Sequence, residues 1–286
     1  MFYVSQDEEK SLSTGPLGLS ANYSECYSVE LLHPMPRAEA RRAVGLDLGS
    51  DAGLALLGKD LWTGYEFSWL DTKGKPLVAG LKIEVDCATT NIVESKSMKL
   101  YLNGFAQTQF VDAQAVSARL NKDLTVAFAG EVVVKVIPID ELAGQWASMK
   151  GQCLDGLDIQ VTEYQRAPEL LSLVSASPQV ATEHLYTHLF RSLCPVTAQP
   201  DWATVIVNYT GEAIDHEGLL GYLVSYRSHQ AFHETTIERI YADIMTCCQP
   251  TFLSVNGRFQ RRGGLDINPF RSSKVCTVPN ERMPRQ

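Results

Sequence analysis

The internal repeat between the two halves of this 286-residue chain constrains its fold more than any other feature. An acidic residue followed by aromatic residues at +7 and +11 occurs twice, with an offset of 121 positions: Glu94, Tyr101 and Phe105, then Asp215, Tyr222 and Tyr226. A pattern that returns at one fixed offset indicates two copies of one structural unit. We therefore expect two similar modules, domain 1–150 and domain 151–286, which meet somewhere within about 141–180.

Both halves also show the same order of predicted elements, strand–strand–helix–helix–strand. In the first half these segments are 65–69, 77–87, 97–110, 112–128 and 132–137. In the second half they are 185–190, 204–209, 218–231, 235–248 and 252–259. Helices with one apolar stripe need a sheet face to cover. The order predicts an α+β fold in which helices pack on one face of antiparallel sheets.

The composition excludes several classes of protein. With 45% hydrophobic and 20% charged residues, the chain is globular rather than disordered or fibrous. Its net charge of −8 argues against general binding to nucleic acid or to an anionic membrane. No signal peptide and no apolar run long enough for a membrane span are recognisable. Seven cysteines without a Cys-x-x-Cys pair fit a reducing cytoplasm.

The segment Glu94-Ser95-Lys96-Ser97-Met98-Lys99 stands where a predicted strand gives way to a helix. Ser95 or Ser97 can cap that helix and leave backbone N–H groups free, while Lys96 and Lys99 add positive charge. Such a combination suits the binding of a phosphate. The alternative is an ordinary capped and charged helix start.

A loop bounded by prolines carries Cys194 and, seven positions later, Asp201. A rigid loop can direct a thiol and a carboxyl toward one ligand, which provides a nucleophile and a partner for proton transfer. The alternative is a small buried cysteine and an aspartate in a turn.

Two further segments carry charge next to predicted element ends. The carboxylate of Glu234, in Phe232-His233-Glu234, can accept two parallel N–H bonds from a guanine-like edge, or it is an acidic residue at a helix start. Arg261-Arg262-Gly263-Gly264 combines positive charge with glycines that let a backbone approach a phosphate, or it is a polar hairpin turn.

The chain has no Gly-x-Gly-x-x-Gly motif, so a Rossmann cofactor site is not indicated. It has no cysteine–histidine spacing typical of zinc, so we expect no metal site.

Together these segments resemble one family, the NADPH-dependent 7-cyano-7-deazaguanine reductases, which are the nitrile reductases of queuosine biosynthesis. The resemblance rests on four motifs in the family's order, which are 94–102, 193–202, 232–234 and 261–269. It covers most of the chain from about residue 15 and is thinnest at about 141–180. The chain resembles the long form of this family, with two tandem tunnelling-fold modules, a homodimer and one active site per chain between the halves.

The resemblance also implies a role for each motif residue. The Cys194 thiolate would add to the nitrile carbon to form a thioimide, and Asp201 would give a proton to the nitrogen. The base would be held by Glu94 and Glu234 and lined by Val93, Ser95 and His233. NADPH would be contacted by Ser95, Lys96, Arg262 and Gly263. The reaction would then be the four-electron reduction of a nitrile to an aminomethyl group.

Two other functions are compatible with parts of the sequence. A purine- or tRNA-binding module that lost catalysis would keep the pocket, but the intact pair of Cys194 and Asp201 argues against it. A tunnelling-fold cyclohydrolase or pterin synthase would need zinc or a histidine set that the six scattered histidines do not provide.

Overall fold

The computed structural model describes residues 27–46, 54, 56–142, 148–174, 180–278, 280, 282–283 and 285–286. The N-terminal stretch in which no signal peptide was expected, 1–26, lies outside these residues, as do 143–147 and 175–179 of the expected module boundary. Within the described residues, no helix is long and apolar enough to cross a membrane.

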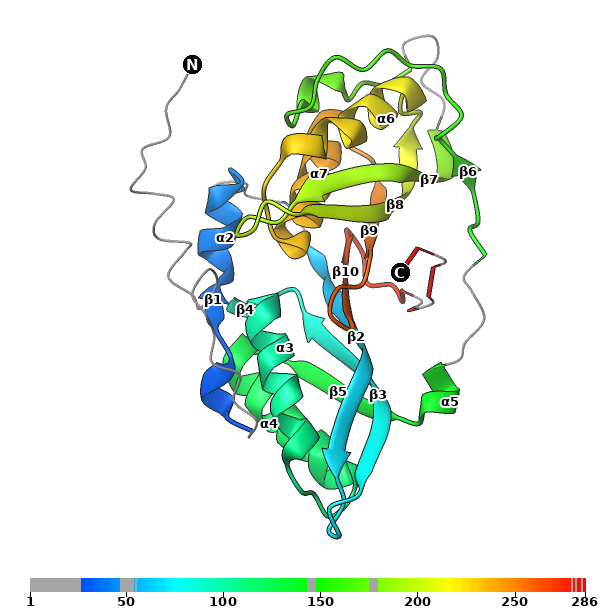
Figure 1. Cartoon of the computed structure of the whole chain (residues 1–286). Coiled ribbons are helices and arrows are strands. Elements are labelled where there is room, and N and C mark those ends of the chain that lie inside the picture. Colours follow the sequence, from blue (N-terminus) through cyan, green and yellow to red (C-terminus); the bar gives the residue numbers. More distant parts are fainter. Residues whose placement is uncertain are drawn as a thin grey trace.

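One eight-stranded sheet runs through both halves, in the order β5-β3-β2-β10-β9-β8-β7-β6 (Figure 1). All neighbouring strands are antiparallel except β6 and β7, which are parallel. A second, two-stranded antiparallel sheet consists of β1 and β4. The α+β class is therefore confirmed, with sheets that are mostly antiparallel.

The first half begins with three short elements, η1 (Val29–Leu31), β1 (Pro34–Pro36) and α2 (Arg37–Ala43). It continues with β2 (Leu57–Leu70), β3 (Pro76–Asp86), β4 (Asn91–Val93), α3 (Ser95–Asn103), η2 (Gly104–Gln107), α4 (Ala113–Phe128), β5 (Val132–Ile137) and α5 (Ile139–Leu142). The predicted helix 97–110 is thus an α-helix that ends at Asn103 and is followed by a 3₁₀ turn.

The second half contains β6 (Gln152–Cys153), η3 (Pro168–Leu170), β7 (Val180–Leu193), β8 (Pro200–Glu212), α6 (His216–Val224), η4 (Ser225–Ser228), α7 (His233–Cys248), β9 (Phe252–Phe259) and β10 (Leu265–Ser272). The predicted strand 185–190 is only the middle of β7, and it spans a bulge between Thr187 and Phe190. The predicted helix 218–231 likewise ends as α6 at Val224 and continues as a 3₁₀ turn.

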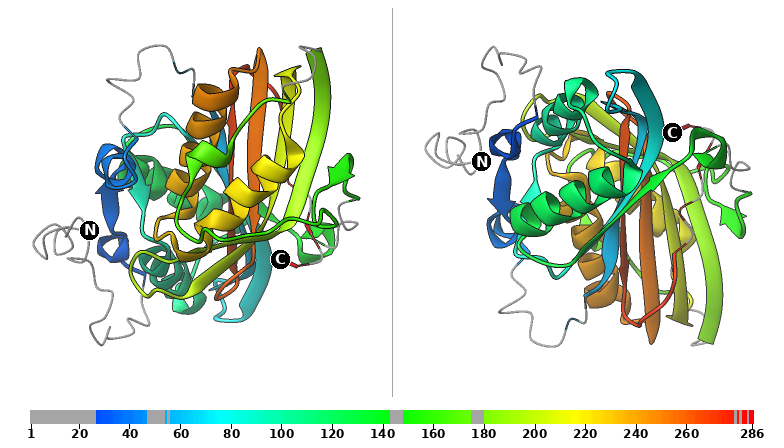
Figure 2. Two further views of the ribbon diagram at one scale, coloured as in Figure 1. Left: turned by 90° about the horizontal axis from the view of Figure 1, so that it is seen from above. Right: turned by 90° about the horizontal axis from the view of Figure 1, so that it is seen from below.

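The long helices lie on one side of the sheet (Figure 2), as the sequence predicted. Each half has an apolar cluster between helices and strands, and the cluster of the first half also includes Leu265 and Ile267 of β10. The apolar stripe of α7 is buried along its length: Ile237, Ile240, Tyr241, Ile244 and Cys248. The period of 3.6 residues therefore predicted correctly which side of this helix faces the core.

The repeat is visible in buried hydrogen bonds as well as in element order. The Tyr101 hydroxyl donates to Oδ2 of Asp123 at 2.9 Å, and the Tyr222 hydroxyl donates to Oδ2 of Asp243 at 2.7 Å. Each of these pairs joins the two helices of its own half. The backbone just after each second helix is left-handed too, with φ of 49° at Ala129 and 47° at Gln249.

The strand β10, which the sequence did not predict, joins the two halves. It pairs with β2 from Leu265 opposite Gly64 to Ser272 opposite Leu57, and with β9 on its other side. The β10 side chains are buried throughout, so they show no polar–apolar alternation, and Pro269 argues against a central strand. These two features hid the strand from sequence analysis.

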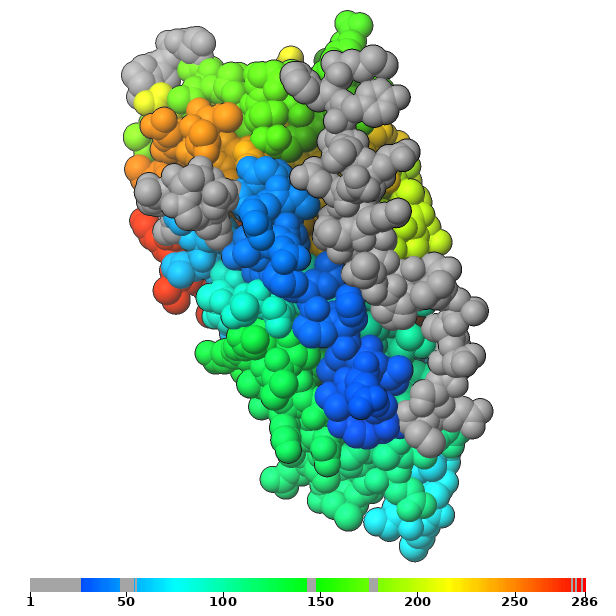
Figure 3. All heavy atoms as spheres, turned by 90° about the vertical axis from the view of Figure 1, so that its left-hand side faces the viewer, coloured from blue at the N-terminus to red at the C-terminus, as the bar shows by residue number. Residues whose placement is uncertain are grey.

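Buried charges reinforce this junction. The guanidinium of Arg41 donates to both oxygens of Glu238 on α7, at 2.8 and 2.9 Å. Arg271 of β10 reaches Glu238 at 2.8 Å and Asp60 of β2 at 2.7 Å, and Arg37 bonds Asp60 at 2.9 Å. In Figure 3 the segment 27–46 lies across atoms of both halves. The N-terminal segment therefore ties the halves together through charge as well as through contact.

Candidate active site

A pocket of about 250 Å³ lies where the two halves meet. Its walls come from the start of α3, the loop between β7 and β8, the start of α7 and the hairpin between β9 and β10. The lining residues are Val93, Glu94, Ser95, Lys96, Lys99, Cys194, Pro195, Thr197, Gln199, Asp201, Ala231, Phe232, His233, Glu234, Gln260, Arg262, Leu265 and Ile267. All predicted site residues except Gly263 are among them.

The short loop between β7 and β8 presents Cys194. The Cys194 N–H donates to the carbonyl of Gln199 at 2.9 Å, and the Ala198 N–H donates to the carbonyl of Cys194 at 3.0 Å. Ala198 takes a left-handed φ of 53°, which closes the loop. The Leu193 N–H also donates to the carbonyl of His229, in the segment before α7, at 2.8 Å. These bonds hold the partly exposed thiol beside the start of α7.

Asp201, the second residue of β8, is buried and contacts two proton-bearing groups. Its Oδ1 lies 3.2 Å from Nε2 of His233 and 3.1 Å from a terminal nitrogen of Arg262. Arg262 is held in turn by the Gln199 side chain at 3.2 Å. The carboxyl is therefore fixed between α7 and the β9–β10 hairpin, on the same pocket as Cys194.

At the start of α7, His233 and Glu234 face the pocket in different ways. The His233 ring stacks on Phe259, with centroids 3.8 Å apart, and its Nδ1 is buried without a hydrogen-bond partner among the described residues. Burial raises the pKa of Glu234 to about 7, and the negative charge of Asp60 adds to this, while His233 opposes it. A ligand with N–H groups would satisfy both the free ring nitrogen and the buried carboxyl.

Glu94 itself caps helix α3, which corrects the expectation that Ser95 or Ser97 would do so. Its two carboxylate oxygens accept the N–H groups of Lys96 and Ser97, each at 2.8 Å. The hydroxyl of Ser97 instead donates to the Glu94 carbonyl at 2.7 Å. A longer side chain can cap here because the strand enters the helix with extended backbone at Glu94. These two N–H groups are therefore not free for a phosphate.

Three cationic side chains line the pocket, Lys96 and Lys99 from the first half and Arg262 from the second. Burial lowers the pKa of Lys99, and Glu94 counteracts this while Arg262 adds to it. Gly263 is not a lining residue, but it lies against Lys99, with a left-handed φ of 58° that favours glycine. The positive charge of the site therefore comes from both halves.

Lys99 lines the pocket, although the sequence motifs indicated only its positive charge and no binding role for it. It follows Lys96 by three positions, so the two side chains lie on neighbouring turns of one helix face. That spacing is the signal that identifies it. The apolar wall from Leu265 and Ile267 had no comparable signal, because it depends on the unpredicted β10.

Comparisons with known proteins match most of the chain. A family model described as nitrile reductase, 7-cyano-7-deazaguanine-reductase N-term, matches residues 23–136, and one described as QueF-like protein matches residues 200–276. The NADPH-dependent 7-cyano-7-deazaguanine reductase of Legionella pneumophila (strain Lens) is 47% identical over 93% of this chain and 92% of its own length. The enzyme of the same name from Delftia acidovorans is 47% identical over 94% and 97%.

A solved structure of the apo form of the archaeosine synthase QueF-Like is 20% identical and covers 35% of this chain and 99% of its own. Its TM-score of 0.30 is too low to support an argument about the fold.

Proposed function

Because the chain belongs to the family of NADPH-dependent 7-cyano-7-deazaguanine reductases, we propose that it reduces the nitrile of 7-cyano-7-deazaguanine to an aminomethyl group, a step of tRNA queuosine biosynthesis. The observation that carries the proposal is the shared pocket of Cys194, Asp201 and Glu234. A nucleophile, a proton donor and a carboxylate for a guanine-like edge are the three groups that this reaction requires.

Cys194 supplies the nucleophile. Its thiolate adds to the nitrile carbon, so that a C–S bond forms while one C–N π bond becomes an N–H bond with a proton from Asp201. The resulting thioimide is more electrophilic than the nitrile. After a hydride has been added to the thioimide carbon, the C–S bond breaks, which returns the thiolate of Cys194 and leaves an imine for the second half of the reduction. Asp201 lies beside His233, through which its proton can be replaced.

The residues of the pocket also fit NADPH. Its phosphates need cations, and Lys96, Lys99 and Arg262 line the site, with Ser95 and Gly263 next to them. When bound, NADPH would supply a hydride to each half of the four-electron reduction. The protein's part is to hold these anionic groups between its halves and to keep the thiol and the acid in place.

Recognition of the base falls to the two carboxylates. Glu234 is buried at the pocket and would accept two N–H bonds from the guanine-like edge. Glu94 would add a further contact, because each oxygen that accepts a backbone N–H retains a second lone pair. Nδ1 of His233 would find its partner on the ligand, and Val93 and Ser95 would line the ring.

The proposal extends to the organisation of the protein. We assign 1–150 and 151–286 to two tandem tunnelling-fold modules, and the repeated Tyr–Asp bonds and helix caps support this division. We further propose a homodimer that works in the cytoplasm and binds neither nucleic acid nor membrane, in agreement with the negative net charge.

The test is to mix the purified chain with NADPH and 7-cyano-7-deazaguanine and to follow the loss of cofactor absorbance. Two equivalents of NADPH should be consumed per nitrile, and the product should carry an aminomethyl group by mass spectrometry. Tight binding of the nitrile without any oxidation of NADPH would instead indicate a purine-binding module that does not catalyse.

A further inference from the structure

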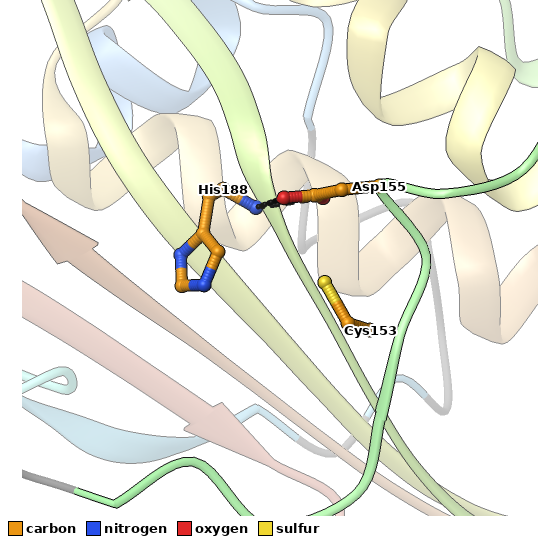
Figure 4. Close-up of side chains that lie close together, drawn as sticks. All are labelled: Cys153, Asp155 and His188. Atoms are coloured by element: carbon orange, nitrogen blue, oxygen red, sulfur yellow. Dashed lines mark hydrogen bonds between the residues drawn. The ribbon is translucent and has the colours of Figure 1, made fainter.

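Three chemically different side chains meet outside the pocket, on the β6 edge of the sheet. A sulfur, a carboxylate oxygen and a ring nitrogen of Cys153, Asp155 and His188 all lie within 4.8 Å of one another. Figure 4 shows them where the segment that follows β6 runs beside β7. We propose that they form a binding site for a divalent transition-metal ion.

Backbone bonds bring the two segments into this position. β6 pairs in parallel with β7, with Cys153 opposite Tyr186, and the Leu154 N–H donates to the Tyr186 carbonyl at 2.9 Å. Oδ1 of Asp155 then accepts the Thr187 hydroxyl at 2.6 Å and the His188 N–H at 3.0 Å. The carboxylate is therefore fixed through one oxygen, while the other has only a longer contact of 3.3 Å and can bind a cation.

The imidazole of His188 is oriented as well. Its Nδ1 lies 2.8 Å from the hydroxyl of Thr204 on β8, which leaves Nε2 as the nitrogen for a ligand. Thr204 is buried, so this contact fixes the plane of the ring. A hydrogen bond from the second ring nitrogen is the usual support of a metal-bound histidine.

The set of donors selects the kind of ion. Thiolate and imidazole favour Zn²⁺ and similar ions over Mg²⁺ and Ca²⁺, which prefer oxygen ligands. Metal–ligand bonds of about 2.0–2.3 Å require the ligand atoms to approach more closely than 4.8 Å. The exposed Cys153 side chain can make that adjustment, and the fourth position of a tetrahedron would be open to water. Binding would hold the segment after β6 against β7.

The experiment uses Co²⁺ and Zn²⁺ as probes of the full chain. Cobalt bound to a thiolate gives a charge-transfer band in the near ultraviolet, so a titration should show this band saturating at one equivalent per chain. Zn²⁺ should displace the cobalt and abolish the band. Cys153→Ser should remove the band, whereas Cys247→Ser, another exposed cysteine, should retain it. Cys194→Ala should retain it too, which separates this site from the active-site thiol.

A second variant tests the support of the histidine. Thr204→Val keeps the shape of the side chain but removes the hydroxyl, and it should weaken Zn²⁺ binding about 10- to 100-fold. A band that persists in Cys153→Ser, or the absence of any band in the unaltered chain, would overturn the proposal. Neither outcome depends on nitrile reduction, so the site and the proposed reaction succeed or fail separately.

Discussion

Oδ1 of Asp201 lies 3.2 Å from Nε2 of His233, so the proposed acid is in direct contact with an imidazole. Asp201→Asn keeps the shape of the side chain but has no acidic proton to transfer. Adduct formation at Cys194 and turnover should both slow by about 10²–10⁴-fold, the usual contribution of general acid catalysis. Rapid-quench mass spectrometry and steady-state rates measure the two effects. The surface variant Asp158→Asn serves as the control, and unchanged rates in Asp201→Asn would remove this residue from the mechanism.

The nucleophile is tested by an adduct that needs no cofactor. Without NADPH, the unaltered chain should gain the mass of one nitrile at Cys194 and at none of its other cysteines. Cys194→Ala should still bind the nitrile in calorimetry, but it should form no adduct and show no turnover, because hydride transfer to an unactivated nitrile lacks the thioimide. Labelling of Cys87 or Cys247, or activity in Cys194→Ala, would contradict the assignment.

Glu234 should couple substrate binding to pH. Its pKa is raised to about 7, chiefly by burial, so the carboxylate that accepts paired N–H groups forms as the pH rises through 7. Nitrile binding should therefore tighten between pH 6 and 8, a range set by this pKa. Glu234→Gln should cost about 2–4 kcal/mol of binding, because one amide N–H would face a donor. Isothermal calorimetry at pH 6 and pH 8 measures both effects. Equal affinity of Glu234→Gln and the unaltered chain for the nitrile would contradict this role of Glu234.

The raised pKa of Glu234 predicts that the folded protein loses stability over the pH range in which nitrile binding tightens. A raised pKa means that the folded state holds its proton more tightly, so this stabilisation is present below the ordinary value of 4.5 and is lost as the pH rises through about 7. Glu234→Gln removes a buried charge and should raise Tm at pH 8 but change it little at pH 4. Glu217→Gln, at an exposed position in the first turn of α6, should change Tm little at either pH.

Arg262 contacts Asp201 and is proposed to bind a phosphate of NADPH, so its removal should have two effects. Arg262→Ala should raise KM for NADPH, and more so at low salt, where contacts with phosphate are stronger. It should also slow adduct formation, because Asp201 loses its contact at 3.1 Å. Lys96→Ala should raise KM alone. Arg261→Ala is the matched control, since Arg261 lies over Tyr65, 5.1 Å from the ring centre. Equal use of NADH and NADPH by the unaltered protein would contradict the phosphate assignment.

Glu238 should matter for folding rather than for chemistry. Burial opposes its charge, but Arg271, Arg41 and Arg37 outweigh this and lower its pKa to about 2, so its stabilisation is lost as pH falls from 4.5 toward 2. Glu238→Gln leaves Arg41 without its anion and leaves Arg37 and Arg271 with Asp60 alone, and it should cost about 3–5 kcal/mol of unfolding free energy. Urea unfolding at pH 7 measures this against Glu84→Gln, which breaks an exposed pair with Lys59. A loss no larger than that of the control would exclude a structural role.

Local patterns were enough to predict the α+β class and much of the element order. The strand Phe252–Phe259 was predicted with the bounds that it has, and the buried stripe of α7 followed from its period of 3.6 residues. These features depend on neighbours along the chain, which is why a single sequence reveals them. Pro269 and the burial of β10 on both faces hid the strand that makes two sheets into one.

The motifs likewise named the residue types of the site, but only the tertiary structure decided what each one touches. Asp201 contacts Arg262 because pairing of β8 with β9 brings the β9–β10 hairpin to the start of β8, and Glu94 caps its helix because the backbone at Glu94 is extended. His188 and Cys153 lie 35 positions apart and have no metal-like spacing, yet pairing of β6 with β7 brings them together. The sequence determined the chemistry that is available, and long-range strand pairing, which no local pattern encodes, determined where that chemistry is assembled.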